Sequence, residues 1–166
     1  MKRNSRRRQR RPALNYEKQI ERKRHDEYRS GGFKCAHCKQ WVVINPFIGT
    51  ANRNHCNMCL WSRHVDIKKG DRLSDCHGGM RPIALTFKHE GNAKVGEIML
   101  VHHCSVCEKI SINRIAGDDI EDHILQVFTE SFMLAQELSA ELAAQDIYQL
   151  VKTDEPAVRT QLFGSI

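Results

Sequence analysis

A long apolar run is the first feature missing from this 166-residue sequence. No stretch reaches the roughly 18 consecutive apolar residues that a membrane-spanning helix needs. The opening MKRNSRRRQRRPALNY carries basic residues but no apolar segment after them, so it lacks the pattern of a secretory signal. We therefore expect a cytoplasmic protein with no membrane association.

Catalytic motifs are missing as well. The sequence contains no HExxH zinc-protease motif, no complete HxE…PCxxC deaminase signature and no nucleophile motif. An enzyme is one hypothesis, in which Asp118, Asp119 and Asp122 bind magnesium, but capping of a helix by Asp118 or Asp119 explains these acids adequately. We predict that the protein is not an enzyme and has no catalytic residues.

Seven cysteines stand out against these absences. Cytosolic reductants keep thiols reduced, and an odd number of cysteines cannot all pair, so metal binding explains the cysteines better than disulfides do. A redox dithiol is a weaker explanation because such a motif normally lies in a βαβ fold, which this sequence does not predict. Six of the cysteines form three CxxC units, at Cys35/Cys38, Cys56/Cys59 and Cys104/Cys107.

Each CxxC unit can supply half of a tetrahedral zinc site, because its turn places two thiolates on one ion. With Cys76 and one histidine, the three units provide eight ligands, enough for two Zn²⁺ ions. The predicted ligands are Cys35, Cys38, Cys56, Cys59, His64, Cys76, Cys104 and Cys107.

The spacing leaves two ways to divide these ligands. The favoured division joins the second CxxC unit to His64 and Cys76, so that the first and third units form a four-cysteine ribbon. The alternative joins the first and second units, and gives Cys76 and the third unit a histidine from His77, His102 or His103.

Charge divides the chain into a basic front and an acidic rear. Residues 1–29 carry 12 Lys/Arg and 4 Asp/Glu, whereas residues 118–166 carry 2 Lys/Arg and 10 Asp/Glu. Basic surfaces gain affinity for polyanions by releasing counterions, so nucleic acid is the first partner to consider. Residues 1–31 have few apolar side chains and are expected to form a largely disordered arm.

The apolar pattern changes along the chain. Strand-like runs at 41–44, 82–87 and 97–101 alternate with glycine-rich turns. From Asp118 to about Lys152, apolar residues recur at helical spacing without glycine or proline, which predicts a long amphipathic helix, or a pair of helices with a break near Ser139. The tail at 153–166 contains Pro156 and is expected to be loosely held.

These patterns predict an α+β fold. We expect a basic arm at 1–31, a small β-rich, zinc-ribbon-like domain with two zinc sites at 32–117, an acidic amphipathic helical segment at 118–152 and a tail at 153–166.

Three separated motifs carry a resemblance to a known family. They are RNHCNMC at 53–59 followed by LWSRHVD, GDRLSDCHGGMRPI at 70–83, and HHCSVC with NRIAGDD at 102–119. In this order they resemble the bacterial RNHCP domain family, with Asn57 in place of the proline of its signature. The resemblance implies a small zinc-binding domain from Phe33 to Asp119; it does not imply a biochemical role.

Two further hypotheses concern function. The first is binding of RNA, structured or ribosomal, with DNA as an alternative, by the arm and by loops of the zinc domain. The predicted contact residues are Arg3, Arg6, Arg7, Arg8, Arg10, Arg11, Arg53, Asn54, Arg63, Arg72 and Arg114. The second is an adaptor that binds a protein partner, or a second copy of the chain, through residues 118–152.

Overall fold

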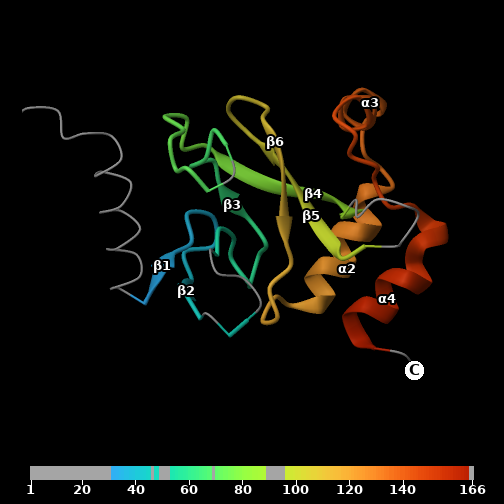
Figure 1. The fold of residues 1–166 in the computed structure, drawn as a ribbon, viewed down its shortest axis with the longest axis horizontal. Coiled ribbons are helices and arrows are strands. Elements are labelled where there is room, and N and C mark those ends of the chain that lie inside the picture. Colours follow the sequence, from blue (N-terminus) through green and yellow to red (C-terminus); the bar gives the residue numbers. More distant parts are fainter. Residues whose placement is uncertain (1–30, 46, 49–52, 69, 89–95, 165–166) are drawn as a thin grey trace, which may run out of the picture.

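The structure is a computed structural model that describes residues 31–45, 47–48, 53–68, 70–88 and 96–164. The predicted arm at 1–31, with all six of its proposed RNA-contacting arginines, therefore lies outside the described residues apart from Gly31. Figure 1 shows a sheet in the middle, a small hairpin at one end and helices at the other. The predicted α+β class is confirmed.

Four antiparallel strands form the main sheet in the order β3-β4-β5-β6. Strands β4 (Gly79–Phe87) and β5 (Ile98–Cys104) are central, and β3 (Ser62–Arg63) and β6 (Ile110–Arg114) lie outside them. The central strands correspond to the runs predicted at 82–87 and 97–101. Strand β6 was not predicted, because its five residues, ISINR, include only two apolar side chains.

A two-stranded hairpin forms a second, smaller sheet from β1 (Gly32–Lys34) and β2 (Trp41–Val43). Val42 is fully buried and packs against Cys35 and Cys56. The strand run predicted at 41–44 is thus present, and it faces the first cluster of cysteines.

Three α-helices follow the sheet: α2 (Glu121–Ser131), α3 (Gln136–Ala144) and α4 (Glu155–Phe163), the last preceded by the 3₁₀ helix η1 (Lys152–Asp154). Of the two alternatives predicted for 118–152, the structure has the pair of helices and not the single long one, and the break comes before Ser139. The N–H groups of Phe132, Met133 and Leu134 donate to carbonyls three residues earlier, which tightens the chain and ends α2.

The helices cover both faces of the sheet. Helices α2 and α4 bury Phe128 and Val158 against Leu85 and Leu100 on one face, and α3 buries Leu142 among side chains that include Val101 on the other. The apolar side chains on which the adaptor hypothesis rested therefore pack within the chain.

The last described segment is held more firmly than predicted. Val158 of α4 is fully buried in the main core. The side chain of Gln161 accepts a hydrogen bond of 3.0 Å from the N–H of Ile98 and donates one of 2.9 Å to the carbonyl of Gly96. The expected loose tail is therefore an ordered helix docked at the start of β5.

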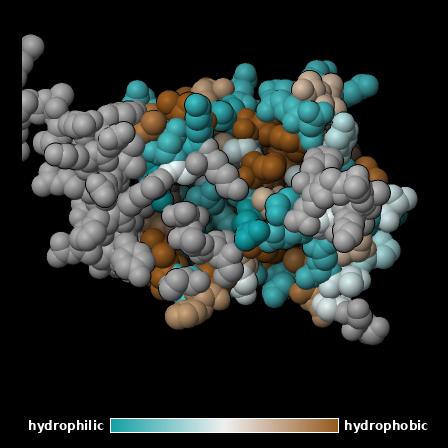
Figure 2. Space-filling view, in the orientation of Figure 1, coloured by the Kyte–Doolittle hydropathy of each residue, from teal (hydrophilic) through white to brown (hydrophobic). Residues whose placement is uncertain are grey.

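On the face shown in Figure 2, the coloured part of the surface has hydrophilic residues next to separate hydrophobic patches. Within the described residues, no helix combines the length and the apolar character that crossing a bilayer requires.

Candidate metal centres and the adjoining cleft

All three CxxC units fold into the same turn. In each unit the N–H of the first cysteine donates to the carbonyl five residues later, and its own carbonyl accepts from the N–H four residues later. The residue after the second cysteine has a left-handed backbone, with φ of 65° at Lys39, 59° at Leu60 and 62° at Glu108. Such a turn aims two thiols at one point.

The first group of thiols combines the first and second CxxC units, Cys35, Cys38, Cys56 and Cys59. The Sγ atoms of Cys35 and Cys59 lie 3.7 Å apart, and those of Cys38 and Cys56 lie 3.6 Å apart. At a Zn–S bond of about 2.3 Å, the edge between two sulfurs of a tetrahedral site is roughly 3.8 Å. The spacing of the thiols thus fits one tetrahedral ion.

The second group combines His64, Cys76, Cys104 and Cys107. The Sγ atoms of Cys76 and Cys104 lie 3.7 Å apart, again close to the edge of a tetrahedral site. Nδ1 of His64 lies 3.1 Å from Sγ of Cys107, somewhat closer than metal ligands normally approach each other. In each group all four ligand atoms lie within 4.8 Å of one another.

Strand pairing brings the second group together. The N–H of His64 donates to the carbonyl of Gly78 at 2.8 Å, and the N–H of His77 donates to the carbonyl of His64 at 3.1 Å. These bonds continue the β3–β4 ladder beyond the strands, so Cys76 lies beside His64.

The register of β4 and β5 delivers the third CxxC unit to the same place. Met80 of β4 lies opposite Cys104 of β5. A Cβ atom added at Gly78 would lie only 2.8 Å from Sγ of Cys104, so a larger residue there would displace the thiol. Glycine at this position lets the backbone before β4 lie in contact with the Cys104 thiol.

The structure therefore differs from the favoured division of the ligands. It joins the first and second CxxC units, as the alternative did, and it places His64 in the second group, where the alternative had expected His77, His102 or His103. His102 is instead fully buried beside the carbonyl of Leu60. The eight residues predicted as ligands are all brought into the two groups.

The thiol environments differ within each group. In the first, burial acts to raise the pKa of Cys38, but hydrogen bonds with the backbone of Gln40 and with the other thiols outweigh it and lower that pKa. Burial raises the pKa of Cys59.

In the second group, a hydrogen bond with the backbone of Gly78 acts to lower the pKa of Cys76, but burial and the neighbouring Cys107 and Cys104 thiols outweigh it and raise that pKa. Burial also acts to raise the pKa of Cys104, but hydrogen bonds from the N–H groups of Cys107 and Val106 and contact with His64 outweigh it and lower that pKa to about 7. The Cys104 thiolate, which is the form that binds metal, is thus favoured in the second group.

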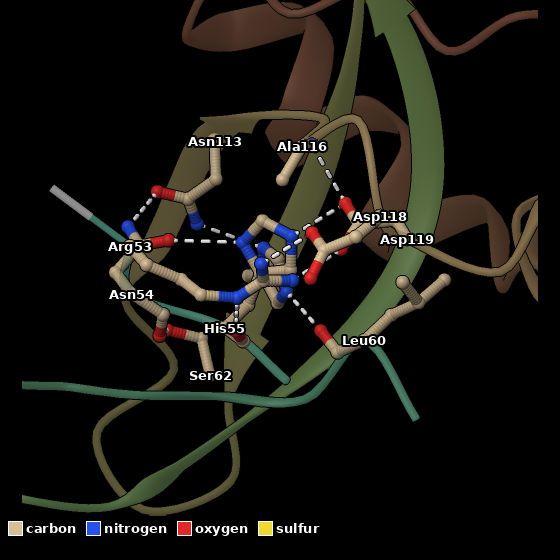
Figure 3. Close-up of polar contacts among 10 residues, drawn as sticks. Arg53, Asn54, His55, Leu60, Ser62, Asn113, Ala116, Asp118 and Asp119 are labelled. Carbon is tan, nitrogen blue, oxygen red and sulfur yellow. Dashed lines mark hydrogen bonds and ion pairs between the residues drawn. The ribbon is translucent and has the colours of Figure 1, made fainter. Parts of the chain in front are cut away.

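A buried polar network is built around residues 53–55, directly before the ligand Cys56 (Figure 3). The Arg53 guanidinium is fully buried and forms ion pairs with Asp118 and, at 2.7 Å, with Asp119. The other oxygen of Asp119 lies 2.7 Å from Nε2 of His55 and accepts the N–H of Ala116 at 2.8 Å. The buried charge of Arg53 is therefore matched by two carboxylates.

The network continues into the sheet. The side-chain amide of Asn54 donates to Asn113 of β6, and the amide of Asn113 lies 2.8 Å from Nδ1 of His102 in β5. Nε2 of His102 lies 2.7 Å from the carbonyl of Leu60, to which it donates. Burial, together with the nearby His55, lowers the pKa of His102 to about 3, so its ring is neutral.

Two predicted RNA contacts belong to this network. The side chain of Arg53 has no exposed surface, and Asn54 is half-buried and bonded to Asn113. The proposal that Arg53 contacts RNA is therefore wrong, because the ion pairs with Asp118 and Asp119 occupy its guanidinium. Those two acids do not cap α2 either, since its N-cap residue is Ile120. The sequence did hold a signal for this network. An Arg-Asn-His run stands directly before a ligand cysteine, and a pair of aspartates that can balance the arginine comes later in the chain.

A cleft of about 690 Å³ opens beside the network, between β3, the loop at 64–72 and β6. Five cationic side chains line it in addition to the paired Arg53, whereas Asp66 is the only acid among its described lining residues. The carboxylate of Asp66 accepts the N–H groups of Gly70 and Arg72 and so holds the loop. The five cations are Arg63, Lys68, Arg72, Lys109 and Arg114.

The remaining predicted RNA contacts line this cleft. Arg63 is exposed, Arg72 is half-buried, and Arg114 is 48% exposed while it pairs with Glu97 at 3.0 Å. Lys109, directly before β6, donates to the carbonyl of Ile67 at 3.3 Å and so connects the start of that strand to the loop. Three of the eleven predicted contacts thus line one surface without being fully buried.

Comparison with known proteins gives one match. A family model described as RNHCP domain matches residues 30–125, which is more than half of the chain. Neither the curated proteins nor the solved structures contain a match.

Proposed function

This chain belongs to the RNHCP domain family, and from that premise we propose that it is a cytoplasmic, zinc-stabilised protein that binds RNA, structured or ribosomal. The observation that carries the proposal is the cationic cleft, because it gathers five positive side chains and a single acid on one described surface. The zinc sites hold this surface in shape, and the basic arm adds affinity.

Zinc is the ion we assign to each group, two in all. Three or four cysteine thiolates in a tetrahedral arrangement favour Zn²⁺ over the oxygen-preferring ions Mg²⁺ and Ca²⁺. The bound ions would neutralise the crowded thiolates and lock the CxxC turns, in the manner of a zinc ribbon. Because four protein ligands leave no position for water, we assign the ions a structural role and the protein a binding function.

The second ligand group is directly connected to the cleft. His64 lines the cleft itself, and Arg63 precedes it in the chain. Lys68 and Arg72 lie in the segment between His64 and Cys76, and Lys109 follows the third CxxC unit by two residues. Metal at the second group would therefore fix four of the five cations.

Phosphate recognition follows from these side chains. Arginine forks contact two phosphate oxygens at once, and lysines contribute point charges. Each neutralised phosphate releases counterions, so affinity should fall steeply as salt rises. Such contacts position the backbone but do not read the sequence.

The test is RNA binding by the zinc-loaded full chain at several salt concentrations, measured by fluorescence anisotropy with RNA and with DNA of the same sequence. We expect salt-sensitive binding of RNA. Charge reversal in the cleft, Arg63→Glu with Lys68→Glu, should weaken binding about tenfold or more. The negative slope of log K against log salt should become shallower by roughly one to two.

The matched control is Arg81→Glu with Lys152→Glu, which changes the net charge equally at exposed positions outside the cleft. It should leave binding nearly unchanged. Equal losses in both variants would show that only the overall charge matters, and no salt-sensitive binding by the wild type would refute the proposal. Co-sedimentation with ribosomes, with and without residues 1–29, then tests the ribosomal target.

A further inference from the structure

A second, smaller cavity opens off the cationic cleft. Its volume is about 140 Å³, against about 690 Å³ for the cleft. The two share walls that include Ser62, Arg63, Val65 and Arg72. A ligand chain lying in the cleft can therefore extend a group into this side pocket without leaving the surface.

The lining of the side pocket differs from that of the cleft. It includes two aromatic side chains, Phe33 of β1 and Trp61 beside β3, both half-buried, together with Ala36 of the first CxxC turn. Cationic side chains of Lys34 and Arg63 also line it. An aromatic wall with positive charge at hand suits a flat heteroaromatic group attached to a phosphate.

The indole of Trp61 is held in a fixed orientation. The imidazole of His37 stacks on it with ring centroids 4.1 Å apart and an interplanar angle of 3°. On β4, a Cβ atom added at Gly79 would lie 3.1 Å from the indole, so glycine at this position leaves room for the ring. Because the imidazole covers one face of the indole, a ligand ring stacks on the other face or takes the place of His37. A side chain that is ordered in advance loses little conformational entropy when a ligand binds.

Arg53 also forms part of the pocket wall, but its charge is balanced by Asp118 and Asp119. The wall that it provides therefore does not act as a second phosphate site. Phosphate groups would bind in the open cleft, where Lys68 and Lys109 supply positive charge.

We propose that the side pocket binds one unstacked nucleobase of single-stranded RNA, with the flanking phosphates in the cationic cleft against Arg63 and Arg72. The inference rests on the proposed RNA binding and adds the form of the RNA. The pocket is too small for a base pair, and bases in a duplex are already stacked, so only a single-stranded segment, a loop or a bulge can insert a base.

The first experiment uses Trp61 as its own reporter. The chain has two tryptophans, so Trp41→Phe, at an exposed position, leaves Trp61 as the only one. We expect a single-stranded oligonucleotide to quench the Trp61 emission at saturation. A matched RNA duplex, and an abasic single strand that offers phosphates alone, should bind in anisotropy without quenching.

The second experiment compares affinities. Trp61→Leu should weaken binding of the single strand by roughly fivefold to a hundredfold, the usual range for loss of one stacked base, and leave duplex binding unchanged. Ala36→Leu, which adds bulk at the pocket, should act in the same direction. Ala140→Leu on the exposed surface of α3 is the control, and zinc content confirms that each variant retains its sites.

The outcomes separate this inference from the proposed function. Salt-sensitive binding without quenching, or with equal affinity for single strand and duplex in wild type and Trp61→Leu, overturns the base pocket and leaves RNA binding intact. Absence of any binding overturns both.

Discussion

Asp119 is a buried carboxylate that serves three groups at once. It pairs with Arg53, lies against His55 and accepts the N–H of Ala116. Removing one partner of such a pair leaves a buried charge without full compensation, which costs far more than an exposed ion pair contributes. The Arg-Asn-His residues of the signature thus stabilise the fold through buried polar contacts, next to the ligand cysteine that follows them.

We predict that Asp119→Ala lowers the free energy of unfolding by about 3–5 kcal/mol, because it strips Arg53 of its fully buried partner. Urea denaturation of the zinc-loaded protein measures the change. Glu141→Ala removes the same charge from the exposed face of α3 and should stay within about 0.5 kcal/mol of wild type. A similar small effect at Asp119 would contradict the structural role.

At this scale the sequence predicted the ligands well and the network poorly. Cysteines at CxxC spacing have few alternative uses, so the six paired cysteine ligands could be predicted directly. His64 was favoured only through the division that the structure rejects, and the other division left its histidine open among three others. An arginine has the same sequence signature whether it meets RNA or an aspartate 66 positions away. Only the folded chain distinguishes the buried Arg53 from the exposed Arg63.

Among the elements, α4 is the one whose packing contradicts its apparent sequence character. Pro156 suggested a loose tail, yet proline fits the first turn of a helix, where its missing N–H has no intrahelical partner to lose. The helix then needs only a few apolar contacts, and Val158 and Leu162 supply them. A proline is therefore a signal of where a helix starts as well as where one ends.

Val158→Asp should destabilise the protein by about 3–5 kcal/mol, since it places a carboxylate in the core against β4 and β5. Val151→Asp offers the same substitution at a valine that is 51% exposed and should have little effect. Thermal unfolding followed by circular dichroism compares the two. Equal melting temperatures would mean that α4 does not depend on this docking.

The helical pattern at 118–152 allowed one long helix or a pair of helices, and the structure has the pair, with its break earlier than the predicted position near Ser139. Ile124, Val127 and Phe128 do lie on one buried face of α2. The apolar residues after Ser131 continue at similar spacing but serve α3, which packs on the opposite face of the sheet. Helical periodicity predicts which residues of a helix are buried. It does not predict which face of the sheet they pack against.

For the whole molecule, the division of ligands determines how the metal sites relate to the chain. The spacing allowed both divisions, and the choice depended on strand register, which places Cys104 opposite Met80 and near Cys76. No local pattern contains that information. The fold class and the identity of the ligands could be predicted, whereas their grouping required the sheet.

Two sets of substitutions distinguish the divisions by zinc content. Serine at the first and second CxxC units removes one group and leaves the other, so we expect one zinc per chain by elemental analysis of the purified protein. Serine at the first and third units disrupts both groups and should leave none. The opposite result would support the division that the structure disfavours.

The two ligand groups also differ in when they become complete during synthesis. All four cysteines of the first group are present once residue 59 has been made, whereas the second group waits for Cys107. Because chains fold progressively from the N-terminus as they leave the ribosome, the first ion can be captured while the main sheet is still being translated. The site beside the hairpin would then form before β5 is available to pair with β4, and scarcity of metal would leave its four thiols uncoordinated during that interval.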